Sequence, residues 1–152
     1  QRQMCIRDRV YDSMWGGTRK LAEAVAQGIH QADPEVDIRL YNTAQRDKND
    51  VITSIFCSKA LLFGSPTINK GILTSIAALI EEVKGLRFRD KKAAAFGCYG
   101  WSGESVATIS EELKSCGFEL VDEGLKTLWE PGDEIIDQAR DYGRRFAEAV
   151  RE

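Results

Sequence analysis

Hydrophobic residues along this chain follow two spacings in turn, one typical of a helix and one typical of a strand. A first helix is predicted from Thr18 to the breaker Asp33-Pro34, because apolar residues recur there on one helical face. That face consists of Leu21, Ala22, Val25, Ala26 and Ile29. Residues 36–40 then alternate between apolar and polar or charged side chains, which predicts a strand near a sheet edge.

The same alternation continues to the C-terminal end of the sequence. In chain order, the later predicted elements are a helix capped by Asp47, a buried strand at Ala60–Gly64, a helix over residues 72–83, a buried strand at Ala93–Gly97, a helix over residues 106–116 that Gly117 stops, a last strand within residues 120–129, and a helix from about Asp133. Strands and helices in strict alternation indicate right-handed βαβ units. We therefore predict an α/β, doubly wound fold with a parallel sheet covered by helices on both faces.

The beginning of the chain departs from this pattern. A doubly wound sheet needs a buried apolar strand directly before its first helix, but residues 1–9 read QRQMCIRDR. We interpret residues 1–9 as a truncated or non-native segment, so that only Val10 and Tyr11 remain of the native strand. Residues 10–152 are expected to form one domain, because 152 residues with 43% hydrophobic content suit a single core.

Composition excludes several classes of function. The chain has 21 basic and 24 acidic residues, a net charge of -3, and no basic stripe, which argues against a nucleic-acid partner. No apolar run approaches the roughly 18 residues of a membrane span, and no signal-peptide pattern is present, so a cytoplasmic location is expected. Four cysteines without CxxC spacing and a single histidine predict no metal site.

Candidate chemistry lies in three loops that each follow a strand and lead into a helix: Asp12–Lys20, Gly64–Gly71 and Phe96–Ser105. In an open parallel sheet, ligands bind beyond the carboxyl ends of the strands. The first loop has hydroxyl groups and a glycine pair where a helix begins, so its amides and the helix dipole are suited to a phosphate. The loop matches neither the Walker A pattern nor GxGxxG, and it also fits an ordinary N-capped helix start.

The second and third loops combine flexible residues with flat or apolar ones. With the first loop, they offer four side chains suited to flank a planar ring, namely Trp15, Ile68, Tyr99 and Trp101. Peptide groups that can reach the polar edge of such a ring lie around Thr67, Asn69, Gly97 and Gly100. The alternative is that Tyr99 and Trp101 simply cover the end of the sheet.

Taken together, the three loops resemble the flavodoxin family. Residues 13–18 are similar to its [ST]-x-x-G-x-[ST] phosphate loop, at the expected end of the first strand. The stretches YDSMWGGTRKLAEAVAQGI, GSPTINKG and FGCYGWSGE are closer to the flavodoxin-like domain of flavodiiron proteins, the oxygen and nitric oxide reductases that include the flavorubredoxins. The resemblance covers about residues 10–150.

The resemblance implies a five-stranded parallel sheet in the order 2-1-3-4-5, with noncovalently bound FMN. By position, it implies that the phosphate is held by Ser13, Met14, Trp15, Gly16, Gly17 and Thr18. It implies that the isoalloxazine ring is held by Pro66, Thr67, Ile68, Asn69, Gly97, Cys98, Tyr99, Gly100, Trp101 and Gly103. No catalytic residue is predicted, because in an electron carrier the chemistry belongs to the cofactor.

The resemblance further implies an electron-transfer module that serves a diiron centre in a metallo-β-lactamase-like domain of the same parent protein. Rubredoxin or a similar protein would be the electron donor, and a homo-oligomer is plausible for the family. The chain itself has no clustered histidines and carboxylates, so it is not expected to catalyse the terminal reduction alone. Oxygen and nitric oxide both remain open as the terminal acceptor.

Three other classes share this fold. A free-standing flavodoxin is the main alternative. An FMN-dependent NAD(P)H:quinone oxidoreductase would need an added nicotinamide pocket, and the short loops argue against one. A phosphoacceptor receiver domain would need an aspartate at the end of the third strand, where Gly64 and Ser65 stand.

Overall fold

The computed structural model describes residues 7–88 and 90–151, and over these residues the strands form one sheet. In chain order, the strands are β1 (Arg7–Tyr11), β2 (Ile38–Asn42), β3 (Ala60–Gly64), β4 (Lys92–Tyr99), β5 (Glu119–Leu120) and β6 (Leu125–Leu128). Their order is β2-β1-β3-β4-β5, β6 also pairs with β4, and every pairing is parallel. The predicted 2-1-3-4-5 order is confirmed.

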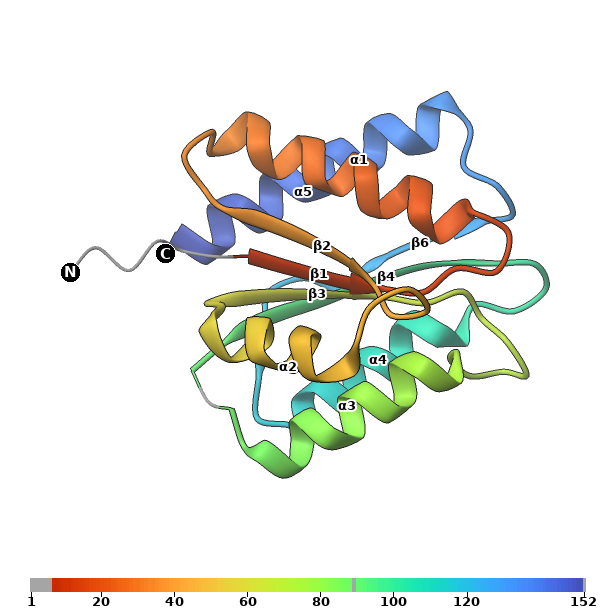
Figure 1. The fold of residues 1–152 in the computed structure, drawn as a ribbon. Helices are drawn as coiled ribbons and strands as arrows, with labels where there is room; N and C mark the ends of the chain where they lie inside the picture. The colour runs from red at the N-terminus through yellow and green to blue at the C-terminus, as the bar shows by residue number, and fades with distance from the viewer. Residues whose placement is uncertain (1–6, 89, 152) are drawn as a thin grey trace.

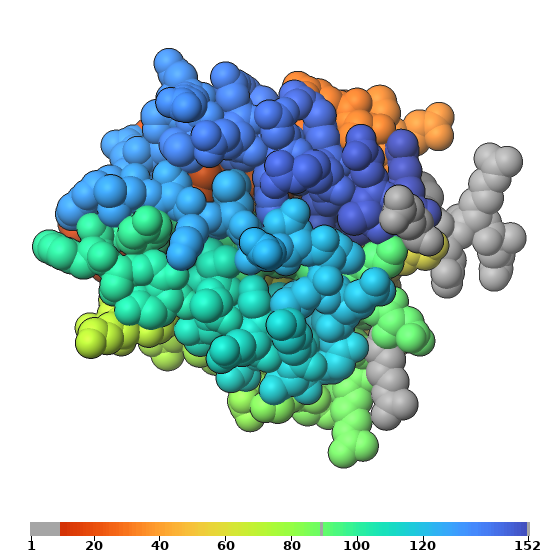
Figure 2. All heavy atoms as spheres, turned by 180° about the vertical axis from the view of Figure 1, so that it is seen from behind, coloured from red at the N-terminus to blue at the C-terminus, as the bar shows by residue number. Residues whose placement is uncertain are grey.

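Helices cover both faces of the sheet, which confirms the doubly wound fold. They are α1 (Gly17–Ala32), α2 (Lys48–Cys57), α3 (Thr74–Leu86), α4 (Glu104–Ser115) and α5 (Asp133–Arg151). Figure 1 shows α1 and α5 on one face and α2, α3 and α4 on the other. The view from behind shows α5 in blue at the top of the molecule and the teal segment that contains α4 below it (Figure 2). None of the described helices is long and apolar enough to cross a membrane.

The strands supply two apolar cores, one on each face, because successive side chains point to opposite sides of a sheet. Leu61 and Phe63 of β3 face α2, α3 and α4, whereas Leu62 lies in the cluster with α1 and α5. All five residues of β3 are buried, as the continuous apolar run predicts for a central parallel strand. Asp47 caps α2 as predicted, with its side chain accepting a hydrogen bond from the Asn49 amide.

Strand β1 begins at Arg7, whereas the sequence predicts that the native part of this strand begins three residues later, at Val10. Its backbone pairs with both neighbours, with Arg7 opposite Ile38 of β2 and Ala60 of β3. Val10 and Tyr11 are buried, as expected for a central strand. The interpretation of residues 1–9 as truncated or non-native stays a prediction, and residues 1–6 lie outside the described residues.

The predicted last strand is divided into two pieces, β5 and β6, which both pair with β4. The break contains Gly124, whose φ of 101° lies in the left-handed region and whose amide donates to the Asp122 carboxylate at 3.1 Å. A Cβ at Gly124 would lie 2.4 Å from the Val106 side chain, so this turn needs glycine. The division places the carboxyl end of β6 beside the end of β4.

Candidate functional site

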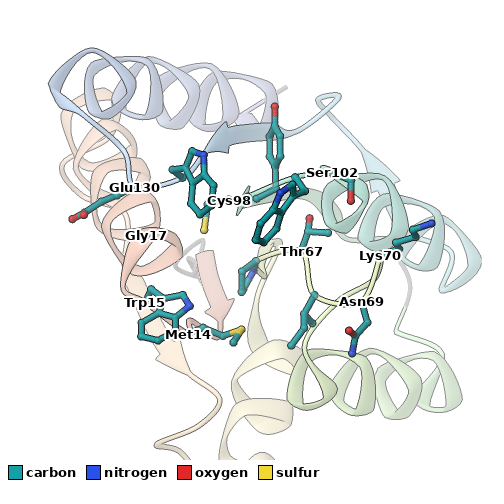
Figure 3. Close-up of a pocket in the computed structure, with 15 residues that line it drawn as sticks. Met14, Trp15, Gly17, Thr67, Asn69, Lys70, Cys98, Ser102 and Glu130 are labelled. Atoms are coloured by element: carbon teal, nitrogen blue, oxygen red, sulfur yellow. The ribbon is translucent and has the colours of Figure 1, made fainter.

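A cavity of about 710 Å³ opens at the carboxyl ends of the central strands. Its walls come from the loops after β1, β3 and β4, as predicted, and from the segment after β6. Figure 3 shows Met14 and Trp15 at one side of this cavity, Asn69 and Lys70 at the opposite side, and Cys98 between them. The three loops therefore meet at one rim of the sheet.

The loop after β1 has the geometry of an anion site. Gly16 is the N-cap of α1 with φ 87°, and its amide donates to the Ser13 hydroxyl at 3.0 Å. Gly17 and Thr18 begin the helix and are buried. Amides of a first helical turn have no acceptor within the helix, and none is found for these two in the part of the chain that the structure describes. Two adjacent N–H groups of buried residues at the positive end of a helix fit a phosphate.

Cys98 joins this loop to β4. Its sulfur lies 3.1 Å from the hydroxyl oxygen of Thr18. A Cβ at Gly17 would also lie 3.1 Å from that sulfur and 3.6 Å from the Trp129 carbonyl oxygen. Glycine at position 17 therefore lets α1 begin close to the ends of β4 and β6.

The loop after β3 contains a tight turn without glycine at its centre. Ile68 and Gly71 exchange backbone hydrogen bonds of 3.2 and 2.8 Å. The two residues between them, Asn69 and Lys70, have φ values of 49° and 59°. Positive φ at both central residues is the geometry of a type I′ turn. The turn holds Ile68 against the cavity.

The second and third loops are hydrogen-bonded to each other through Thr67. The Thr67 amide donates to the Cys98 carbonyl at 2.9 Å, and its hydroxyl accepts from the Ser105 amide at 3.2 Å. Ser105 lies in the first turn of α4, so Thr67 satisfies one of the amides at that helix start. These two hydrogen bonds connect the parts of the cavity wall that follow β3 and β4.

Large apolar side chains are exposed around the cavity. The exposed fraction is 92% for both Trp15 and Trp101, 59% for Trp129 and 50% for Met14. Trp101 and Trp129 approach each other edge to face, with ring centroids 5.6 Å apart. Since Trp15 and Trp101 stand in solvent, they do not fill the cavity themselves, and the apolar rim is free for a flat ligand.

Most predicted site residues reach this cavity. Those that line it are Met14, Trp15, Gly17, Pro66, Thr67, Ile68, Asn69, Cys98, Tyr99, Gly100 and Trp101. Five predicted residues do not line it: Ser13, Gly16, Thr18, Gly97 and Gly103. Gly97 has a packing role, because a Cβ there would lie 2.1 Å from the Ser65 carbonyl oxygen. Ser13, Gly16 and Thr18 instead shape the phosphate loop from within.

Four lining residues were not singled out from the sequence, namely Lys70, Ser102, Trp129 and Glu130, although Ser102 lies within the loop predicted to hold the ring. The segment after β6 is the main omission. The Trp129 amide donates to the Tyr99 carbonyl at 2.7 Å, and Glu130 forms an ion pair with Lys20 of α1. A signal for this segment was available, because Trp129 follows a strand at the same carboxyl edge as the three predicted loops.

The described residues do not bring together the side chains that metal chemistry needs. Within residues 7–88 and 90–151, no three His, Cys, Asp or Glu side chains are grouped to hold a metal ion. What the site does offer is a pair of buried amides beside the cavity, an apolar slot and an aromatic rim. Such a site can hold and orient a planar, phosphorylated ligand.

Comparisons with known proteins agree with this geometry. A family model described as flavodoxin matches residues 10–143. An anaerobic nitric oxide reductase flavorubredoxin from Aeromonas hydrophila is 44% identical over 137 residues, which is 90% of this chain but 28% of that protein. The chain thus spans less than a third of the length of this relative.

Solved structures of related proteins superimpose closely on this chain. The rubredoxin oxygen:oxidoreductase from Desulfovibrio gigas superimposes with a TM-score of 0.91 at 30% identity, covering 96% of this chain and 36% of that one. A flavodoxin from the domain Archaea superimposes with a TM-score of 0.86 at 28% identity, covering 97% of this chain and 99% of that one. The fold therefore matches both a part of a long protein and a whole short one.

Proposed function

Since the chain belongs to the flavodoxin family, we propose that the cavity at the carboxyl edge of its sheet holds FMN noncovalently and that the domain transfers electrons. Flavodoxin-family domains bind FMN, and the resemblance to the FMN domain of flavodiiron proteins is confirmed. FMN supplies the redox chemistry when it is bound. The residues of this chain hold its phosphate, orient its ring and exclude water from one side of it.

The observation that carries the proposal is the orphaned pair of amides at Gly17 and Thr18, beside an apolar slot of about 710 Å³. The phosphate group would lie at the start of α1, where those N–H groups converge. The ring would lie between the exposed indoles and the turn at Asn69 and Lys70. All sixteen residues predicted for FMN binding are proposed for these roles, with Trp129 added to the ring site.

We further propose that the domain is the electron-transfer module of a longer flavodiiron protein. Support comes from the 44% identity to a flavorubredoxin of which the chain covers 28%. In that setting, the module would deliver electrons to a diiron centre in a metallo-β-lactamase-like domain of the parent protein, and rubredoxin or a similar protein would be the donor. Three thiols among the described residues, Cys57, Cys98 and Cys116, form no disulfide, which supports a reducing, cytoplasmic location.

A second candidate function is a free-standing flavodoxin. It is favoured by one observation, the match to the archaeal flavodoxin over 97% of this chain and 99% of that one. The identity is lower than to the flavorubredoxin, at 28% against 44%. We therefore place the module ahead of the free carrier.

A titration with FMN tests the binding proposal. The purified chain is incubated with FMN, desalted and examined for visible absorbance, and the dissociation constant is measured by quenching of flavin fluorescence. The matched variants are Gly17→Val and Gly132→Val. A side chain at Gly17 meets the Cys98 sulfur, whereas a Cβ at Gly132 meets nothing within 4 Å. Gly17→Val should abolish FMN binding and Gly132→Val should leave it unchanged. A colourless wild-type protein without FMN affinity would refute the proposal.

Electron transfer from rubredoxin tests the module proposal. Reduced rubredoxin is mixed with the FMN-loaded chain under anaerobic conditions, and the flavin absorbance is followed by stopped flow. Bleaching within seconds at micromolar rubredoxin supports the module. An absorbance that stays constant over minutes favours the free-standing carrier.

A further inference from the structure

Asp12 lies directly after β1 and immediately before the loop that starts α1. Its backbone amide donates to the Gly64 carbonyl at 3.2 Å, at the end of β3. One carboxylate oxygen accepts the Ser13 amide at 2.7 Å. The other accepts the hydroxyl of Ser75, which is 63 residues away in the sequence. The residue directly before the phosphate loop is therefore bound to helix α3.

A second hydroxyl extends this connection. Thr43, in the segment between β2 and α2, donates its hydroxyl hydrogen to Ser75 at 2.9 Å. The Thr43 amide donates to the Tyr11 carbonyl at 2.9 Å. Three side chains thus form a directional chain from Thr43 through Ser75 to the carboxylate, and hydrogen bonds in such a chain strengthen one another.

The start of α3 explains why the carboxylate is accepted here. Leu73 is the N-cap of this helix and cannot cap it with its side chain, and the first turn contains no acidic residue. The carboxylate of Asp12 supplies negative charge near that helix start from another part of the chain, which is favourable beside the helix dipole. Asp12 is therefore held at α3 both by the hydrogen bond from Ser75 and by its attraction to the helix dipole.

None of these three residues lines the cavity. Their effect on a ligand must therefore pass through the loop they hold. We propose that Asp12 is a positioning residue, tied through Ser75 and Thr43, which fixes Ser13 and the following loop so that the Gly17 and Thr18 amides converge on the FMN phosphate. The proposal rests on the proposed FMN function of the same cavity.

Loss of the Asp12 charge and loss of its hydrogen bonds should change the affinity for FMN in opposite directions. A carboxylate close to a phosphate repels it, so loss of the charge alone would tighten FMN binding. Loss of the hydrogen-bonded tie weakens it, because the loop amides are no longer pre-organised. Riboflavin has the same ring without the phosphate, and a phosphate-loop effect leaves riboflavin binding unchanged.

The experiment compares dissociation constants of FMN and riboflavin for wild type and five variants, one of which is Asp12→Ala. Ser75→Ala removes the hydroxyl and keeps the charge, and Ser75→Thr restores a hydroxyl. Thr43→Val breaks the chain one step further away. Ser110→Ala is the matched control, because Ser110 is a helical serine with a buried hydroxyl that has no partner among the described residues. Thermal unfolding of each variant confirms that it is folded.

We expect Ser75→Ala to raise the FMN dissociation constant about fivefold, the effect of one hydrogen bond, with riboflavin unchanged. Thr43→Val should act in the same direction, and Ser75→Thr should behave as wild type. Asp12→Ala should weaken FMN binding as well, by about tenfold.

Three results would overturn the inference while the proposed function stands: unchanged FMN binding in Ser75→Ala, equal weakening of FMN and riboflavin, or tighter FMN binding in Asp12→Ala. A wild-type protein that binds riboflavin and FMN equally would also overturn it, since no phosphate site would then exist. A wild-type protein that binds neither flavin would overturn the proposed function and the inference together.

Discussion

The sulfur of Cys98 lies 3.1 Å from the hydroxyl oxygen of Thr18, so the carboxyl end of β4 contacts the first turn of α1. This contact joins the two halves of the site, because Thr18 belongs to the phosphate loop and Cys98 lines the cavity. Because Cys98 lines the cavity, we expect a ligand bound there to shield its thiol. Cys98 is therefore a reporter of occupancy.

We expect FMN to protect Cys98 from alkylation. At an FMN concentration one hundred times the dissociation constant, the open fraction falls to about one per cent, so the rate of reaction with iodoacetamide should fall about hundredfold. Peptide mass spectrometry of timed samples measures the rate at each cysteine. Cys57 is exposed and serves as the internal control, with the same rate in both samples. Equal rates at Cys98 with and without FMN would contradict the placement of the ring.

Trp129→Ala should weaken the binding of FMN and riboflavin to the same degree. The indole stands over the rim against Trp101, with ring centroids 5.6 Å apart, and its ring would lie 3.3 Å from a Cβ at Gly100. Loss of one aromatic contact corresponds to about a two- to tenfold rise in each dissociation constant. Fluorescence titration measures both constants.

The control for this prediction is Phe56→Ala, which removes an exposed aromatic ring that does not line the cavity. It should leave both constants unchanged. If Trp129→Ala affected FMN alone, its role would lie at the phosphate and not at the ring, and the assignment of the segment after β6 would be wrong.

The sequence predicted those parts of the fold that local patterns determine. Strand β3 was predicted with its observed bounds, because full burial requires an uninterrupted apolar run. The cap at Asp47 was predicted because a side-chain oxygen must satisfy helix amides two or three residues away. Both features depend on neighbours within a few residues.

Features set by distant contacts were not predictable in the same way. The break between β5 and β6 depends on Val106 approaching Gly124, and no spacing in the sequence shows that contact. The bond between Ser75 and Asp12 likewise joins residues 63 positions apart. Trp129 was missed because residues 120–129 look like one continuous strand. The pattern therefore placed Trp129 inside a strand and not in the loop that follows β6.

Gly28→Ala should destabilise the domain strongly. Helices α1 and α5 cross closely here, and a Cβ at Gly28 would lie 1.9 Å from the Arg140 carbonyl oxygen. Because the obstacle is backbone, the helices must separate, at a cost of about 3 kcal/mol in the free energy of unfolding. Urea denaturation measures the change.

Gly85→Ala is the matched control for this helix crossing. Gly85 also lies in a helix, α3, but a Cβ there meets nothing within 4 Å. Alanine should stabilise that helix by up to about 1 kcal/mol, through its higher helix propensity. Equal effects of the two substitutions would show that α1 and α5 are not in close contact.

Tyr142 should make the domain less stable in alkaline solution. The side chain is fully buried and its hydroxyl donates to the Ala95 carbonyl at 3.3 Å. Burial raises the pKa of this phenol well above its ordinary value, and Asp122 adds to the increase. In the unfolded chain the phenol loses its proton near pH 10. Above that pH the unfolded state binds fewer protons than the folded state, so stability falls as pH rises, by up to about 1.4 kcal/mol per pH unit.

Tyr142→Phe removes this contribution because phenylalanine does not titrate. At pH 8 the variant should be less stable than wild type by about 1 kcal/mol, since the hydrogen bond to Ala95 is lost. Between pH 10 and about pH 11 the phenol ionises in the unfolded chain, which lowers the stability of the wild type but not that of the variant. The difference in stability between the two proteins should therefore shrink or change sign. Urea denaturation at several pH values between 8 and 11 measures both curves. Parallel curves over that range would show that the phenol ionises in the folded protein as it does in the unfolded chain, which contradicts its burial against β4.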